Sequence, residues 1–406
     1  MPLTVSDRAR NVIASPIRKY VPLIKAAEEA GAEFIKLHIG DPDLDAPPRI
    51  LRAIRSYAGK TLPYAPSSGL PEHVAAWQAY YGKLGVAIAP SDFVPTAGCA
   101  EAIQMAMMAV ADPGDDILCF EPLYTGFKAA ARMFGVNLVP VPLDIADNFA
   151  LPAIAEIEKR VTPKTKAIIV INPDNPTGKA WRKEELEAVL AVAGRRNLFV
   201  ISDETYREIV FKGKPSTMLS FPRYRDRVIV VDSLSKRFSV PGARMGCVVS
   251  FNRDVSGAVL KFAMARLSTP TIEQLAVAPL LRDPGAYVKK VVAEYKARRD
   301  AAVGALAKIP GVVHGRPEGA FYVVAKLPIP DADAFVRFLI QDFRKDGVSV
   351  TVTPIKDFYA TPGRGADEIR IALVRPPAVI KKGIGLLAQA LKEYGAERSR
   401  DKAVKR

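Results

Sequence analysis

Lys236 lies in the stretch VIVVDSLSKRFSVPGARMG, directly after the β-branched run Val228–Val231. Such a run, bounded by turn-forming residues, predicts a buried strand, and open α/β sheets place their sites at the ends of strands. Ser233 and Ser235 precede the lysine, and Arg244 follows it between two glycines. An amine, hydroxyl donors and a fixed cation suit a phosphorylated cofactor whose aldehyde forms a Schiff base with the lysine. Plain solvent exposure of the lysine is the alternative.

Two other candidate strands also end in polar side chains. In AIIVINPDNPTGKAW, nearby prolines stiffen the turn, so that Asn175 can present its amide to a ligand. In LFVISDETYREIVF, Asp203 ends the strand and could keep a pyridine nitrogen protonated, while Tyr206 could donate to a phenolate oxygen. The alternatives are a rigid turn before a helix that starts near Lys183, and a helix N-cap at Asp203.

The start of an apolar helix offers a place for a phosphate. Gly98, Cys99 and Ala100 stand at the entry of GCAEAIQMAMMAV, where unpaired N–H groups and the helix dipole favour an anion. Tyr124, in EPLYTGFKAA, follows a strand and could stack on a planar ring, although it could equally be a partly buried aromatic residue. Arg370 lies in the apolar strand EIRIALV, where it needs a carboxylate, either internal or from a substrate.

The elements that must position these residues alternate between strands and helices from about residue 92 to residue 250. Apolar β-branched runs predict strands at 117–120, 137–141, 167–171, 199–202, 228–231 and 246–250. Amphipathic patterns predict helices at 100–111, 124–134, 151–160 and 183–193. This alternation predicts an α/β fold with a mostly parallel sheet covered on both faces, which gives three αβα layers.

The chain after residue 282 has a different pattern. A long charged helix over 286–307 precedes the apolar run GAFYVVAKL, a helix over 333–345, and the runs VSVTVTP and EIRIALV. This order predicts a smaller α+β domain over 283–406, next to a large domain over 46–282. Residues 1–45 are expected to form an N-terminal arm that packs on the smaller domain.

The composition excludes several classes of protein. A hydrophobic content of 49% with 25% charged residues is that of an ordinary globular chain and not of a disordered one. No apolar run approaches the roughly 18 residues of a membrane helix, and the N-terminus does not read as a secretory signal. The three cysteines are scattered, which argues against disulfides and against a zinc site. We therefore expect no metal, and we expect a cytoplasmic location.

The net charge of +15 raises the question of nucleic-acid binding. The basic residues are, however, spread along the chain, with small clusters near 289–290, 298–299 and 381–382 and in the tail ERSRDKAVKR. A solvated basic surface with a frayed tail is the expectation, and such a field could attract anionic substrates. We therefore expect neither a nucleic-acid nor a membrane partner.

Taken in chain order, these motifs resemble the fold-type I, class I/II aminotransferases that depend on pyridoxal 5′-phosphate, of the aspartate/aromatic Iγ type. The resemblance runs from IKLHIGDPD, at residues 35–43, to Arg370. It implies transfer of the amino group of an L-amino acid to a 2-oxo acid, by family habit 2-oxoglutarate, through a Schiff base at Lys236 in a ping-pong mechanism. It also implies a homodimer with shared active sites.

The resemblance gives each cofactor-binding residue a role. Lys236 would form the Schiff base and carry the proton, Asp203 would contact the pyridine nitrogen, and Asn175 and Tyr206 would bond the phenolate oxygen, while Tyr124 would stack on the ring. The phosphate would be held by Gly98, Cys99, Ala100, Ser233, Ser235 and Arg244, and by Tyr64 of the neighbouring subunit.

The substrate contacts follow the same resemblance. Arg370, with Asn175 and Gly40 nearby, would bind the substrate α-carboxylate. Arg266 could read a distal carboxylate from the partner subunit, or it could be a surface arginine at a helix end, and Arg18 and Lys19 are further candidates. The donor could be aspartate, an aromatic amino acid or an alanine-like one.

Two other functions share the fold. A β-lyase or decarboxylase would use the same motifs, because the cofactor lets any of three bonds at Cα break. A DNA-binding regulator would need an N-terminal winged helix, and only about 35 residues precede the first family motif.

Overall fold

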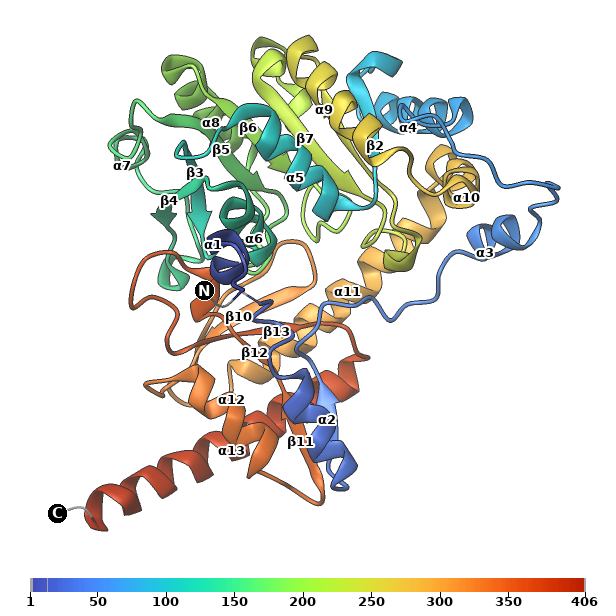
Figure 1. Cartoon of the computed structure of the whole chain (residues 1–406). Coiled ribbons are helices and arrows are strands. Elements are labelled where there is room, and N and C mark those ends of the chain that lie inside the picture. The colour runs from blue at the N-terminus through green and yellow to red at the C-terminus, as the bar shows by residue number, and fades with distance from the viewer. Residues whose placement is uncertain (1–2, 13, 405–406) are drawn as a thin grey trace.

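The computed structural model describes residues 3–12 and 14–404, with side chains described as far as residue 396. The ends of the expected N-terminal arm and of the expected small domain (residues 1, 2, 405 and 406), residue 13, and the side chains of the basic tail lie outside the described residues. Figure 1 shows a large sheet flanked by helices and, below it in this view, smaller sheets with helices of their own.

The large sheet has seven strands in the order β2-β8-β7-β6-β5-β3-β4. Its strands are β2 (Phe93–Thr96), β3 (Asp116–Glu121), β4 (Asn137–Pro142), β5 (Thr165–Ile171), β6 (Phe199–Asp203), β7 (Val228–Ser233) and β8 (Gly246–Ser250). Among these strands β8 pairs antiparallel with both β2 and β7, and the other pairs are parallel. The predicted mostly parallel sheet is confirmed, with β2 as a strand that the sequence did not predict.

Both faces of this sheet are covered, because alternate residues of each strand point to opposite sides. Along β5, Ala167, Ile169 and Ile171 belong to one apolar core, and Ile168 and Val170 belong to another. The first core is completed by α5 (Cys99–Val110), α6 (Thr125–Phe134) and α9 (Arg253–Arg266). The second contains α4 (Pro71–Lys83), α8 (Lys183–Arg196) and α10 (Thr271–Arg282). The predicted three-layer arrangement follows.

Shorter elements connect the layers. Helix α7 (Ile154–Glu158) is shorter than the predicted 151–160, since Pro152 disfavours helical geometry at the residue before it. Helix α3 (Pro48–Arg55) precedes α4. The 3-10 helices are η1 (Pro90–Asp92), η2 (Ile145–Asp147), η3 (Met218–Ser220), η4 (Pro222–Arg227), η5 (Pro241–Ala243) and η6 (Lys356–Phe358).

The smaller sheets lie beside the large one. The four-stranded sheet has the order β12-β13-β10-β9, and β1 pairs in parallel with β11. Its strands and those of the parallel pair are β1 (Glu33–Lys36), β9 (Val313–His314), β10 (Tyr322–Lys326), β11 (Val348–Thr351), β12 (Thr353–Pro354) and β13 (Glu368–Ala372). The helices that pack with them are α2 (Val21–Glu29), α11 (Gly285–Leu306), α12 (Ala332–Gln341) and α13 (Pro377–Val404).

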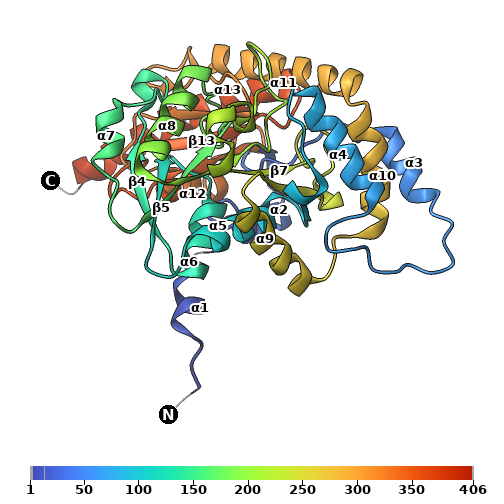
Figure 2. The same cartoon turned by 90° about the horizontal axis from the view of Figure 1, so that it is seen from above.

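The N-terminal segment divides between the two parts. Tyr20, Ile24 and Leu37 belong to the core of the smaller sheets, as expected of an arm that packs there. Helix α1 (Asp7–Asn11) instead contacts α6, and Figure 2 shows it projecting from the body. The division into 1–45, 46–282 and 283–406 stays a prediction. No helix within the described residues is long and apolar enough to cross a membrane.

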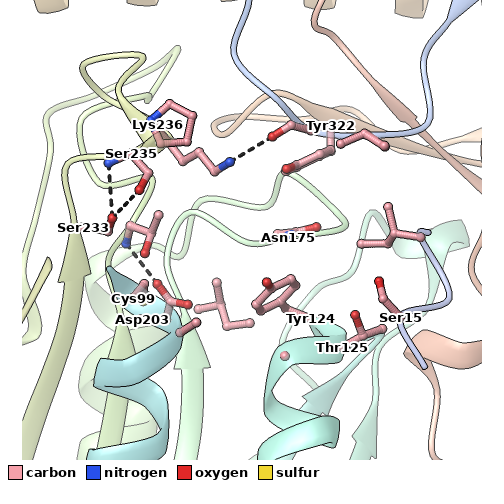
Figure 3. A pocket seen from close by; sticks show the side chains of 18 of the residues that line it. Ser15, Cys99, Tyr124, Thr125, Asn175, Asp203, Ser233, Ser235, Lys236 and Tyr322 are labelled. Atoms are coloured by element: carbon pink, nitrogen blue, oxygen red, sulfur yellow. Dashed lines mark hydrogen bonds between the residues drawn. The ribbon is translucent and has the colours of Figure 1, made fainter. Parts of the chain in front are cut away.

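The topology brings the predicted strand ends together. The parallel strands β5, β6 and β7 are neighbours, with Ile171 opposite Asp203 and Asp203 opposite Val231. Their carboxyl ends therefore share one edge, where α5 also begins. Strand β13 of the smaller sheet brings Arg370 to the same region, which Figure 3 shows at close range.

Candidate active site

The edge of the large sheet opens into a cavity of about 870 Å³. It is lined by these residues named from the sequence: Gly40, Cys99, Ala100, Tyr124, Asn175, Asp203, Tyr206, Ser233, Ser235, Lys236, Arg244 and Arg370. Gly98 lies just behind the lining, beneath Arg244. Tyr64 and Arg266 do not line this cavity. One cavity thus contains most of the predicted site.

Lys236 projects into the cavity from the turn after β7. Its Nζ donates to the carbonyl oxygen of Gly40 over 2.9 Å, and Figure 3 shows the amine near Tyr322. Burial lowers the pKa of Lys236 to about 8, Arg370 and Arg244 act in the same direction, and Asp41 opposes them. Far more of this amine is therefore neutral near pH 7 than of an ordinary lysine, roughly a tenth of it, and the neutral form is the one that a nucleophile or proton acceptor requires.

Asp203 ends β6 and is only 5% exposed. Its Oδ1 accepts from the N–H of Thr205 over 3.0 Å, so the carboxylate caps a turn, and no α-helix follows among the described residues there. The helix N-cap alternative is therefore wrong. Burial raises the pKa of Asp203 to about 6, while the hydrogen bonds from Thr205 oppose the shift. Among the described residues no cation forms an ion pair with Asp203, so this buried carboxylate is suited to a positively charged ring nitrogen.

Arg370 is 1% exposed and reaches across from the smaller sheet. Its Nη1 donates to Asn175 Oδ1 over 2.9 Å and its Nη2 to the carbonyl of His38 over 3.0 Å, while Nε has no partner. Among the described residues no carboxylate forms an ion pair with it, so the internal ion-pair alternative is wrong. A buried guanidinium that lacks an anion is a strong binding site for a ligand carboxylate.

Tyr322 is a cavity residue that the sequence analysis did not select. Its ring lies against the Arg370 guanidinium, 4.4 Å from centroid to Cζ, and its hydroxyl lies 2.8 Å from that of Tyr206. A Cβ on Gly40 would collide with this hydroxyl, which explains the glycine there. The strand GAFYVVAKL was predicted, but strand periodicity alone did not reveal that Tyr322 faces a site.

The expected phosphate cradle has the geometry of an anion site. Gly98 has φ +81°, and a Cβ there would lie 2.5 Å from Arg244 Nη2. The first N–H groups of α5 point out of the helix without intrahelical partners. The hydroxyls of Ser233 and Ser235 lie 2.7 Å apart, and Arg244 is fixed by the carbonyls of Ala97 (2.9 Å) and Pro241 (3.0 Å).

Tyr124 and Arg266 each make defined contacts with neighbouring residues. The Tyr124 ring packs over the start of α6, where a Cβ on Gly126 would collide with it, and Figure 3 shows it on the same side of the cavity as Asp203. Arg266 donates to the carbonyl of Pro95 over 3.0 Å and lies 3.3 Å from Glu101. These contacts favour the helix-end role for Arg266; a substrate contact stays a prediction.

Further lining residues come from segments far apart in the chain. They are Ser15, Pro16, Ile17, Arg18, Ile39, Asp41, Thr125, Gly126, Lys128, Ala129, Ile171, Thr205, Pro241, Tyr322 and Asp357. Arg18, a weaker candidate from the sequence, is among them, whereas Lys19 pairs with Asp333 (2.5 Å) and Asp357 (3.1 Å). No cluster of His, Cys, Asp and Glu suited to a metal occurs in the described part of the chain.

The chain is similar in sequence and in structure to known proteins. The family model "Aminotransferase class I and II" matches residues 32–385. A protein of Aquifex aeolicus named "Probable aspartate/prephenate aminotransferase" is 30% identical over 96% of this chain and 99% of its own length. Human tyrosine aminotransferase is 30% identical over 79% of this chain and 73% of its own length. The solved structure of an alanine aminotransferase from Pyrococcus furiosus superposes with a TM-score of 0.87 at 30% identity, covering 96% of this chain and 100% of the other.

Proposed function

The chain belongs to the class I and II aminotransferases, and from that premise we propose that it transfers the amino group of an L-amino acid to a 2-oxo acid with pyridoxal 5′-phosphate and Lys236. The observation that carries this proposal is the convergence of Lys236, Asp203 and Arg370 on one cavity. Each supplies what the reaction needs: an amine with a lowered pKa, a buried carboxylate, and a buried guanidinium that no described carboxylate pairs with.

The residues fit the cofactor. Asp203 would hold the ring nitrogen in its protonated form, because its own buried carboxylate gains a cationic partner. Asn175 and Tyr206 would donate to the phenolate oxygen, and Tyr124 would lie against the ring. The phosphate would sit on the cradle made by the start of α5 with Ser233, Ser235 and Arg244. When bound, the cofactor supplies an aldehyde that condenses with amines and a protonated ring that withdraws electrons from Cα.

Lys236 and Arg370 would divide the remaining work. Arg370 binds the α-carboxylate through its guanidinium fork and so orients the bond from Cα to hydrogen. Lys236 Nζ would take the proton from Cα and hold it for its later return. The partly neutral amine is suited to both directions of this transfer.

For the substrates, we propose a donor of the aspartate, aromatic or alanine-like type and 2-oxoglutarate as acceptor. The relatives named above support this range, since their names include aspartate, tyrosine and alanine. Arg18 and Lys128 also line the cavity and are candidates for contact with a distal acidic group of the substrate. A cytoplasmic location stays a prediction.

We also propose a homodimer in which Tyr64 reaches the partner's phosphate site. Tyr64 is 80% exposed and lies outside its own cavity. Its loop packs on the segment between α9 and α10, through Ser67 Oγ to the Leu267 carbonyl (2.5 Å) and Thr271 Oγ1 to the Pro63 carbonyl (2.9 Å). Several large apolar side chains on α3, α9, α10 and the connections next to them are exposed: Leu51, Ile54, Leu62, Met264, Leu267 and Leu275. Figure 2 shows the α3–α4 connection extending from the body, as an interface element would.

The test uses the purified protein with pyridoxal 5′-phosphate. Addition of L-glutamate should convert the absorbance of the lysine-bound cofactor to that of its amine form, with 2-oxoglutarate released. Lys236→Ala should lose the lysine-dependent absorbance and nearly all turnover. Release of pyruvate and ammonia from a β-substituted alanine, without any amine form, would instead indicate a β-lyase. Full turnover by Lys236→Ala would refute the proposal.

A further inference from the structure

A group of four charged residues lies beside the cavity without lining it. Glu204, Arg207, Asp232 and Arg237 are each at most 1% exposed. They comprise two carboxylates and two guanidiniums, so their formal charges cancel. We refer to these four residues as the ionic cluster.

Arg207 joins two chain segments, the one after β6 that carries Glu204 and the one at the end of β7 that carries Asp232. Its Nη2 donates to Asp232 Oδ2 over 2.6 Å, and its Nη1 donates to Glu204. The guanidinium also lies over the rings of Tyr80 and Tyr81, at 5.2 and 5.0 Å from their centroids. Hydrogen bonds on two carboxylates and ring faces on the sides leave little freedom for this side chain.

Arg237 joins the same two segments at a second point. Its Nη2 donates to Asp232 Oδ1 and reaches the backbone carbonyl of Glu204 at 3.4 Å, while its Nη1 donates to the hydroxyl of Tyr80. Asp232 Oδ1 also accepts the N–H of Ser233 over 2.6 Å. Asp232 is therefore the acceptor that both arginines share.

Each member of the ionic cluster is next in sequence to a residue of the proposed site. Glu204 follows Asp203, and Arg207 follows Tyr206; Asp232 precedes Ser233, and Arg237 follows Lys236. The backbone ladder between β6 and β7 ends at the pair Asp203 and Val231. Lys236 lies five residues beyond Val231, so the hydrogen bonds of this ladder do not set the position of its side chain. The ionic cluster spans that gap between the two segments.

Stability alone does not account for such a group. Removing four charges from water is costly, and replacing a buried ion pair by apolar side chains often stabilises a protein. What a buried network of charge-assisted hydrogen bonds provides is a preferred arrangement of the chain segments that carry it, even though Nε of Arg207 and of Arg237 has no partner among the described residues. Here those segments carry an amine and a carboxylate whose separation the chemistry must fix.

We propose that the ionic cluster is a positioning device that sets Lys236 relative to Asp203 through Arg237, Arg207 and their shared acceptor Asp232. The proposal rests on the proposed function, because it concerns the amine and the carboxylate assigned there. A misplacement of about 1 Å at a reacting group can lower a rate by about 100-fold, so a loosened cluster should be visible in catalysis and in cofactor affinity.

The test substitutes Arg237→Lys, which keeps the charge but removes the fork that reaches Asp232, Tyr80 and Glu204 together. We expect the apo-protein to bind pyridoxal 5′-phosphate at least about tenfold more weakly, measured by equilibrium dialysis, and kcat to fall by about tenfold or more. The pH midpoint of the bound cofactor's absorbance should move as well. The KM for the amino acid should stay within about twofold, since Arg370 is untouched.

The matched control is Arg298→Lys. Arg298 is 2% exposed and pairs with Asp43 (2.5 Å) and Glu294 (2.8 Å), outside the cavity lining. This variant should lower the melting temperature while cofactor affinity and the pH midpoint stay at the wild-type values. If Arg237→Lys leaves affinity, midpoint and kcat within about twofold of wild type, the positioning role is wrong. It is also wrong if both variants lose cofactor affinity in proportion to their melting temperatures.

Tyr80→Phe decides the matter if Arg237→Lys does not fold. It removes the hydroxyl that accepts from Arg237 but keeps the ring and every charge. Several-fold weaker cofactor binding with a shifted midpoint supports the proposal, and unchanged values overturn it. A wild-type protein that binds no pyridoxal 5′-phosphate would refute the proposed function itself, whereas a wild type that binds it, with unaffected variants, refutes only the ionic cluster's role.

Discussion

The hydrogen bond of 2.9 Å from Arg370 Nη1 to Asn175 Oδ1 connects the small antiparallel sheet to the large parallel one. Arg370 belongs to β13, and Asn175 follows β5. In the proposed reaction the first residue binds the substrate carboxylate and the second contacts the cofactor. The two ligands would therefore meet at this contact.

Arg370→Lys should weaken substrate binding specifically. A lysine offers a point charge where the arginine offers a bidentate fork, so we expect the KM for the amino acid to rise by about 10- to 100-fold. Cofactor affinity, measured by dialysis, should change by less than about twofold. Arg344→Lys, at a half-buried arginine that donates to backbone carbonyls elsewhere, is the control. An unchanged KM for the Arg370 variant would contradict the assignment.

Asp203→Asn should stabilise the apo-protein while abolishing turnover. The folded pKa of about 6 exceeds the ordinary value of 3.8, so between these pH values the folded chain holds a proton that the unfolded chain has released. The free energy of unfolding therefore falls as the pH rises through this window, by at most about 3 kcal/mol. Denaturant unfolding at pH 8 should show the variant to be more stable, and near pH 3.5 the difference should vanish.

The control for this experiment is Asp226→Asn, at a side chain 71% exposed. Its stability should follow the wild-type curve across the same pH range. If the Asp203→Asn protein is no more stable than wild type at pH 8, the buried carboxylate does not lower the free energy of unfolding in the absence of ligand.

Gly98→Ala should damage the phosphate cradle. The left-handed φ of +81° disfavours any side chain, and the added Cβ would push against the Arg244 guanidinium. We expect at least about tenfold weaker cofactor binding by equilibrium dialysis, with competition by inorganic phosphate reduced in parallel. Gly257→Ala, in α9 with open space around its Cα, should bind normally. Equal cofactor affinities of the two variants would show that Gly98 is not part of the phosphate site.

Mixing two inactive variants tests the shared active site. Tyr64→Ala lacks the residue offered to the partner, and Lys236→Ala lacks its own amine. After mixing and reassembly in equal amounts, hybrid dimers should contain one complete site, which restores about a quarter of the wild-type activity. Sedimentation should show dimers throughout. Dimers that form hybrids without recovering activity would mean that Tyr64 serves its own subunit or none.

Tyr322 should have two separable contributions. Tyr322→Phe removes the hydroxyl 2.8 Å from Tyr206 but keeps the ring on Arg370, so the pH midpoint of the cofactor's absorbance should move while KM stays constant. Tyr322→Leu removes the ring as well, and KM should then rise by several-fold. Identical behaviour of the two variants would contradict this division.

The sequence predicted the strand ends well because their chemistry is local. Lys236, Asp203 and Asn175 each follow an apolar β-branched run, and parallel strands must place such ends at one edge. Tyr322 and Ser15 lacked such a signal, since their place in the cavity depends on how distant segments pack. Strand β1 was missed because it has four partly exposed residues and gains its hydrogen bonds from β11, more than 300 residues away.

The ionic cluster was missed for a related reason. Arg207 and Arg237 read in the sequence as ordinary charged residues, and only the pairing of β6 with β7 brings them to one carboxylate. Helix–strand alternation predicts layers, but it carries no information on which charges are enclosed between them.

The two sheets contribute to the cavity unequally. The proposed contacts to the cofactor come from the large sheet and its helices, whereas Arg370 and Tyr322 come from the smaller one. Mutations of Arg370 or Tyr322 are thus expected to change how the substrate carboxylate is bound, while the proposed cofactor contacts of the large sheet stay in place. Asn175, which accepts the hydrogen bond from Arg370, is the residue through which a change in one part would be felt in the other.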